Sequence, residues 1–125
     1  MHEEETWRRT IELFEAGEFW EAHDVLEPLW LDYDGIDREL AAGVILLAAA
    51  LHKARAMENP RGGRRNYAKA LRHLAVVPDR YRGVLVRELE AIVHRALVDR
   101  AERPRWPGGV PGAAPGSDER RGAEA

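Results

Sequence analysis

The sequence contains no cysteine, so disulfide bonds and thiolate metal sites are excluded. It also has no long hydrophobic run. The longest, from Leu40 to Leu51, has 12 residues, whereas a helix needs about 20 to cross a bilayer. The N-terminus, from Met1 to Glu5, is acidic and lacks the basic start and apolar stretch of a signal peptide. We therefore expect a cytoplasmic protein with no membrane-spanning segment.

Positive charge is scarce at the start of the chain. Residues 1–34 contain 2 Arg against 11 Asp and Glu, whereas residues 35–103 contain 14 Lys and Arg against 8 Asp and Glu. The net charge of the whole chain is only −3, which argues against a dedicated nucleic-acid-binding protein. The uneven distribution predicts contact between the acidic first third and the basic remainder, either within one chain or between the subunits of a homo-oligomer.

The alternation of polar and apolar residues that is typical of strands is missing throughout the sequence. Apolar residues at helical spacing instead predict five helices, over residues 4–16, 18–31, 37–58, 65–76 and 79–102. The third of these is apolar on all sides from Leu40 to Leu51, which is typical of a buried central helix. Residues 1–103 are therefore predicted to form one all-α domain, a five-helix bundle.

Two segments rich in glycine are interpreted as irregular. Residues 107–116 are Pro, Gly and Ala with one Val, and this composition predicts a disordered tail over residues 104–125. Trp106 is the one aromatic residue of that tail and is a candidate for docking on the bundle. The second segment, Arg61 to Arg65, predicts an exposed loop before the fourth helix, with an anion site at the helix N-terminus as the alternative.

The candidate site lies on the predicted helix over residues 18–31. His23 and Glu27 are four positions apart, so their side chains lie next to each other on a helix. At about 100° per residue they share a face with Phe19 and Leu26, which predicts that both polar groups point inward. An inward imidazole and carboxylate are costly unless they are paired. His52, on the next predicted helix, is the natural third member of the cluster.

The stretch from Phe14 to Trp30, followed by the stretch from Gly43 to His52, resembles the domain-of-unknown-function family 309. The family pattern contains Phe-x-x-Gly-x-Tyr/Phe, then His-Glu/Asp-x-x-Glu-x-x-Trp, then Gln-Gly-hydrophobic-Ile-x-x-Ala-x-x-x-His, and then an Asn and a Gly. The resemblance covers about residues 10–75 and implies a small all-helical fold without an established activity. It implies motif positions at His23, Asp24, Glu27, Trp30, Gly43, His52, Asn59 and Gly63. This chain has Ala42 where the family usually has Gln.

Three hypotheses for this cluster remain open. The first is a binding or interaction module for a small molecule or a protein. Its predicted ligand-binding residues are His23, Asp24, Glu27, Trp30, His52 and Asn59. The second is a small metal-dependent hydrolase in which His23, Glu27 and His52 hold a divalent metal ion. The third is a buried His23–Glu27 pair that only satisfies its own hydrogen bonds.

Overall fold

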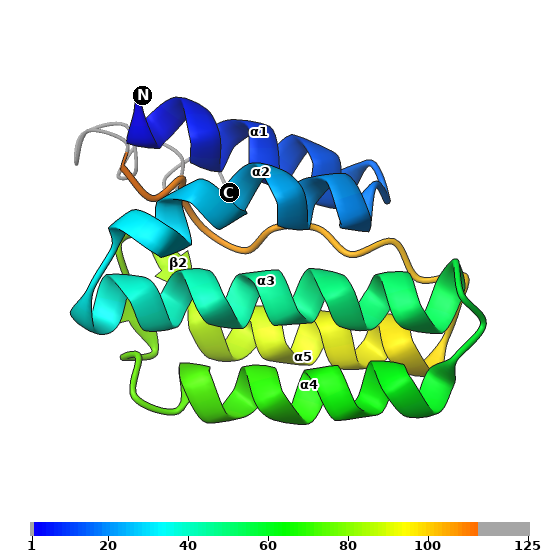
Figure 1. Ribbon diagram of the computed structural model, residues 1–125. Coiled ribbons are helices and arrows are strands. Elements are labelled where there is room, and N and C mark those ends of the chain that lie inside the picture. Colours follow the sequence, from blue (N-terminus) through cyan, green and yellow to red (C-terminus); the bar gives the residue numbers. More distant parts are fainter. Residues whose placement is uncertain (1, 113–125) are drawn as a thin grey trace.

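The protein is a two-layer bundle of helices, and the computed structural model describes residues 2–112 (Figure 1). The α1–α2 hairpin forms one layer, and α3, α4 and α5 form the other. The elements are α1 Glu3–Glu15, α2 Phe19–Asp32, α3 Gly35–Arg55, α4 Pro60–Leu74, β1 Arg80–Tyr81, β2 Val84–Leu85 and α5 Val86–Val98. The predicted all-α fold with five helices is confirmed. No helix of residues 2–112 has the length and apolar character needed to cross a membrane.

The predicted central helix, α3, is confirmed as the core of the bundle. It packs against α2 on one side and against α4 on the other. Leu40, Leu47 and Leu51 are completely buried along it. A helix that contacts neighbours on opposite sides is apolar on both, which explains why the sequence of α3 has no polar face from Leu40 to Leu51.

The fourth helix begins five residues earlier than the sequence predicts. The predicted loop from Arg61 to Arg65 is wrong, because these residues form the first turns of α4. Pro60 occupies the first turn, where its missing N–H costs nothing, and the side chain of Asn59 accepts a hydrogen bond from the backbone N–H of Gly62 at 2.9 Å. Gly62 and Gly63 are buried. Here the glycines do not break the helix; they allow α4 to approach α3 closely.

The fifth helix, α5, is shorter than the sequence predicts, because the first part of the predicted range forms a β-hairpin instead. Tyr81 pairs with Val84, and the two residues between them, Arg82 and Gly83, have φ angles of +50° and +84°. Two consecutive positive φ angles are the geometry of the tight hairpin turns that match the twist of the strands. The prediction that the sequence contains no strand is therefore wrong at this one short hairpin.

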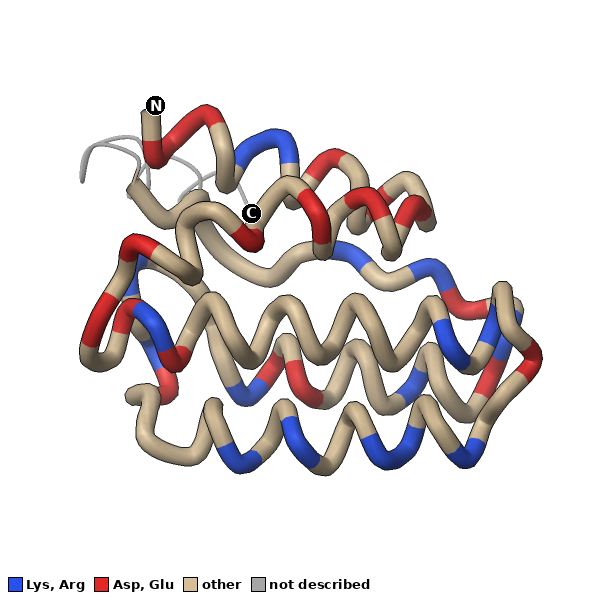
Figure 2. The backbone as a smooth tube through the Cα atoms, viewed as in Figure 1, with Lys and Arg blue, Asp and Glu red and all other residues tan. Residues whose placement is uncertain are grey.

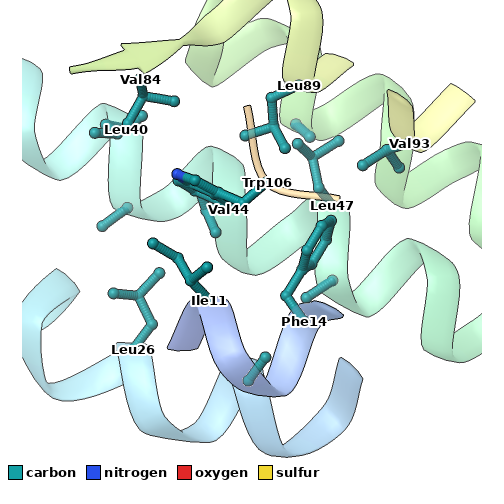
Figure 3. Packing of buried hydrophobic residues seen from close by; sticks show 14 of the residues in the cluster. Ile11, Phe14, Leu26, Leu40, Val44, Leu47, Val84, Leu89, Val93 and Trp106 are labelled. Atoms are coloured by element: carbon teal, nitrogen blue, oxygen red, sulfur yellow. The ribbon is translucent and has the colours of Figure 1, made fainter. Parts of the chain in front are cut away.

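Residues 104–112 extend the packed body beyond the boundary that the sequence predicts at residue 104. They pass between the two helical layers, where the Trp106 ring lies 6.1 Å from the Trp7 ring and 6.0 Å from the Phe14 ring, measured between centroids (Figures 1 and 3). Trp106 is 7% exposed and Val110 2%. The prediction that Trp106 docks on the body therefore agrees with the structure, whereas disorder from residue 104 does not. The predicted disorder of residues 113–125 lies outside the described residues.

The segment that contains Trp106 is fixed by backbone as well as side-chain bonds. The Pro107 carbonyl accepts a hydrogen bond from the Leu85 N–H at 3.2 Å, and Gly108 forms a β-bridge with Val84. The Trp106 Nε1–H donates to the Gly109 carbonyl at 2.9 Å. A buried indole N–H needs such a partner. The chain turns back after Trp106, so that the Gly109 carbonyl, three residues later, supplies it.

Acidic and basic residues gather on different helices (Figure 2). α4 has no Asp or Glu, and its exposed cations form a continuous stripe that faces away from the α1–α2 layer. The stripe consists of Arg61, Arg64, Arg65, Lys69 and Arg72. α2 is the opposite case, with acidic residues and no Lys or Arg. The predicted charge asymmetry thus places an acidic outer helix and a basic outer helix on different layers of the bundle.

Candidate functional site on helix α2

The two histidines of the predicted cluster meet on an indole ring that the sequence analysis assigned to no site. The Trp20 ring stacks on the His23 ring with a centroid distance of 4.7 Å and an interplanar angle of 22°. Its centroid also lies 5.1 Å from that of His52, across the contact between α2 and α3. Trp20 nevertheless remains 46% exposed. Two imidazoles from neighbouring helices therefore hold a large aromatic side chain in place at the surface.

The carboxylates of the cluster lie outside the core. Glu27 Oε2 is 3.8 Å from His23 Nε2, and Asp24 Oδ1 is 3.3 Å from His23 Nδ1. The Glu27 side chain is 49% exposed, whereas that of His23 is 17% exposed. The prediction that Glu27 points inward is therefore wrong. The core face of α2 is formed by Phe19, Ala22, Leu26 and Leu29, and this face turns Glu27 towards water.

A stripe of four exposed side chains runs along the outward face of α2. Trp20 and Leu31 lie at its two ends, with Asp24 and Glu27 between them. Leu31 is 61% exposed, as is the Asp24 side chain. These residues follow the i, i+4, i+7, i+11 spacing of one helical face. The same spacing in the sequence could have revealed the stripe, had exposed apolar residues been sought as well as inward polar ones.

Two further residues of the predicted site have contacts of their own. Trp30 is partly buried, and the Arg38 guanidinium lies 4.9 Å from its ring centroid. Asn59 caps α4, as described above. Within residues 2–112, no group of three or more His, Asp or Glu side chains is arranged to hold a metal ion. His23, Glu27 and His52 thus do not form the ligand set that the hydrolase hypothesis requires.

A polar network lies at the N-terminal end of α1. The sequence did not reveal it, because its members are far apart along the chain. The Tyr33 hydroxyl accepts a hydrogen bond from Trp7 Nε1–H at 3.0 Å and donates one to the Glu3 carboxylate. Arg82 Nη1 lies 2.6 Å from Glu3 Oε1 and 3.5 Å from Asp37 Oδ1. No sequence spacing relates these residues, since the hairpin turn that delivers Arg82 was itself not predicted. The network joins the acidic first helix to the basic part of the chain.

This network changes the titration of its members. The hydrogen bond from Arg82 lowers the pKa of Glu3 below its usual 4.5, against the opposing effect of partial burial. Burial, and then the hydrogen bond to Glu3, raises the pKa of Tyr33 to about 12. Burial is the largest single influence on Arg82 and opposes its charge, but the hydrogen bonds and charge interactions with Glu3 and Tyr33 together outweigh burial and raise the Arg82 pKa. The network therefore favours an ionised Glu3 and a neutral Tyr33 in the folded protein.

We expect Glu3 to contribute to acid sensitivity. Because its folded-state pKa is depressed, its stabilising effect is present above pH 4.5 and is lost as the pH falls through the folded-state value. The free energy of unfolding of Glu3→Gln should therefore fall less steeply than that of the unaltered protein between about pH 6 and about pH 3. The difference should be at most about 1 kcal/mol, because water screens a partly exposed pair. Urea titrations across this range, with the exposed Glu5→Gln as control, measure it. Equal slopes for Glu3→Gln and the unaltered protein would contradict the assignment.

Comparison with known proteins places the chain in a family. Residues 7–66 match the model of the family described as domain of unknown function DUF309. A crystal structure of the conserved hypothetical protein TTHA0068 from Thermus thermophilus is 42% identical and superposes with a TM-score of 0.67 over 74% of this chain and 96% of that one. The chain belongs to the DUF309 family. An uncharacterized protein from Aquifex aeolicus is 31% identical over 83 residues, which are 66% of this chain but only 25% of that protein.

The DUF309 pattern combines two kinds of position in this structure. Gly43 and Gly63 lie where α3 and α4 meet. A Cβ at Gly43 would lie 2.3 Å from the Leu74 side chain, and one at Gly63 would lie 2.9 Å from the Ala50 carbonyl oxygen. Packing therefore accounts for both glycines. His23 and His52 are different, because they support a partly exposed tryptophan. In this DUF309 chain, His23 and His52 are thus the pattern positions that packing of the core alone does not explain, and both lie at the surface around Trp20.

Proposed function

We propose that the protein is a binding module that takes a positively charged helical segment of a partner protein on the outward face of α2. The observation that carries this proposal is the exposed stripe of Trp20, Asp24, Glu27 and Leu31 on a helix without Lys or Arg. Two exposed apolar anchors at the ends of one helical face fit a partner helix that lies along it.

The chemistry of the stripe favours a cationic partner. An indole attracts Lys or Arg through its ring face, and Asp24 and Glu27 supply negative charge one and two turns further along the helix. Leu31 offers an apolar contact at the far end. His23 and His52 restrict the Trp20 ring before the partner arrives, and this reduces the conformational entropy lost on binding. Tryptophan at the surface is also the residue type that most often dominates binding energy.

The test uses two fluorescein-labelled amphipathic helical peptides of equal length, one with Lys and Leu and one with Glu and Leu. Fluorescence anisotropy should show saturable binding of the Lys–Leu peptide and none of the Glu–Leu peptide, and added salt should weaken the complex. We expect Trp20→Ala to weaken binding at least about tenfold, which corresponds to about 1.4 kcal/mol. The double variant Asp24→Asn, Glu27→Gln should weaken it similarly.

The matched control is Glu12→Gln, which removes an exposed carboxylate from α1 instead of α2. It should leave the affinity unchanged, and all variants should retain the thermal midpoint of the parent protein. Equal affinity for both peptides, or equal loss of affinity in Glu12→Gln and in the α2 variants, would refute the proposed face. Binding that survives Trp20→Ala unchanged would do the same.

A further inference from the structure

A hollow of about 400 Å³ opens beside the turn between α1 and α2. Its walls come from three parts of the chain: the turn at Gly17, the end of α3 at Arg55, and the segment after α5. The segment after α5 contributes Arg100, Arg103 and Pro104. The volume lies within the range of about 300–1,000 Å³ that is usual for small-molecule sites. None of these residues belongs to the outward face of α2.

Arg55 is held rigidly at the edge of this hollow. Its Nη2 donates to the Ala96 carbonyl at 2.9 Å and to the Glu102 carbonyl at 2.7 Å, and its guanidinium carbon lies 5.9 Å from the centroid of the Phe19 ring. All of these acceptors are backbone carbonyls, so none of these hydrogen bonds places a carboxylate against the Arg55 charge. Within residues 2–112 its Nε–H has no hydrogen-bond partner, but this nitrogen is buried and is therefore not available to a ligand in the hollow. The other guanidinium nitrogens would have to make the contact.

The positive charge around the hollow is only partly compensated, because Asp99 and Glu102 act on Arg55 without forming an ion pair with it. Three arginine residues line it, Arg55, Arg100 and Arg103, and within residues 2–112 none of them forms an ion pair with a carboxylate. The one carboxylate of the lining, Glu15, already accepts a hydrogen bond from the Trp106 backbone N–H at 2.9 Å. Burial, and then the nearby charge of Arg100, lowers the pKa of Arg55. An anion in this position would relieve that repulsion.

We propose that this hollow binds a small organic anion whose phosphate or carboxylate oxygens accept hydrogen bonds from the guanidinium groups that line it. Arginine is the side chain best suited to such oxygens, because its planar fork can donate two parallel hydrogen bonds. Phe19 and Pro104 supply apolar wall for the carbon skeleton of the ligand. Arg55 and Arg100 are already tied to the backbone, the latter through a bond to the Arg55 carbonyl at 3.2 Å. Within the part of the chain that the structure describes, Arg103 has no such bond, so its side chain is the one available to turn towards the anion.

The experiment titrates the full chain with three probes: inorganic phosphate, glycerol 3-phosphate and succinate. Each is compared with sodium chloride at matched ionic strength, by calorimetry and by the shift in thermal midpoint. We expect at least one probe to bind saturably and to raise the midpoint as its concentration passes the dissociation constant, whereas chloride does not. Comparing glycerol 3-phosphate with succinate shows whether the hollow prefers a phosphate or a carboxylate. Comparing glycerol 3-phosphate with inorganic phosphate shows what the carbon skeleton contributes.

Arg103→Gln is the informative variant, and it should weaken binding about tenfold through the loss of a charged hydrogen bond. Arg103→Lys, which keeps the charge but loses the fork, should weaken it less. Arg65→Gln on the basic stripe of α4 is the matched control and should bind like the parent. An equal effect of chloride, an unchanged affinity in Arg103→Gln, or an equal loss in Arg65→Gln would overturn the proposal.

This site and the α2 face can fail independently. Trp20→Ala should leave the affinity for the bound anion unchanged, and Arg103→Gln should leave the affinity for the Lys–Leu peptide unchanged. Loss of anion binding in Trp20→Ala would show that the hollow does not act as a separate site, and would overturn this inference.

Discussion

Ending the chain at Arg103 should lower the free energy of unfolding by at least about 3 kcal/mol relative to a chain that ends at Gly112. The truncation removes Trp106 and Val110, both buried among residues of the two layers. Removing a buried Trp or Phe side chain alone typically costs about 3–5 kcal/mol. The shorter chain also loses the backbone bonds that join Leu85 to Pro107 and Gly109 to Gly83.

Urea denaturation followed by circular dichroism measures the difference. Trp106→Ala in the chain that ends at Gly112 isolates the side chain from the backbone bonds, and it should account for most of the loss. Arg105→Ala is the matched control, because it removes an exposed neighbour, and it should change stability by less than about 0.5 kcal/mol. A truncated chain with the stability of the longer one would show that the Trp106 segment contributes no packing energy.

The second large effect should come from one methyl group at Gly63. In an exposed helix interior, Gly→Ala stabilises by up to about 1 kcal/mol. At Gly63 the new Cβ would lie 2.9 Å from the Ala50 carbonyl oxygen and 3.1 Å from the Ala54 Cβ. Backbone cannot move aside as a side chain can, so α3 and α4 must separate. We therefore expect Gly63→Ala to destabilise by about 1–3 kcal/mol, the usual range for overpacked interiors.

The sign of this change is what matters. Thermal and urea denaturation of Gly63→Ala should be compared with Arg65→Ala, which adds no bulk and lies on the exposed side of the same helix. The control should stay within about 0.5 kcal/mol of the parent protein. If Gly63→Ala proved more stable than the parent, helix propensity would be decisive, and the contact between α3 and α4 would not be as close as described.

Helical periodicity was a good guide to this fold where a helix has one apolar face or is apolar throughout. It predicted α1, α2 and α3 to within a few residues, because tertiary contacts reinforce the local pattern there. It was a poor guide at Gly62 and Gly63. Two glycines after a proline are typical of a loop, and only the presence of α3 against them makes a helix favourable.

The sequence predicted which histidines belong to the candidate site better than it predicted how the side chains of the site are arranged. His23 and His52 do come together, but on Trp20, which was not among the predicted site residues. Glu27 was placed inward because a helical wheel gives spacing but not the position of the boundary between buried and exposed faces. That boundary depends on which side of α2 meets α3, and no pattern within α2 alone determines it.

The path of the C-terminal segment has a consequence for the order of folding. The bond between Trp106 and Glu15 spans 91 positions of the sequence, and contacts of such long range form slowly because a large loop must close first. Trp7 and Phe14 share this ring as a neighbour, so part of their surface stays uncovered until residue 106 has been synthesised and has arrived between the layers. The growing chain therefore exposes the apolar surface that Trp106 later covers. Until Trp106 has packed, the protein is most susceptible to misassembly and to binding by chaperones.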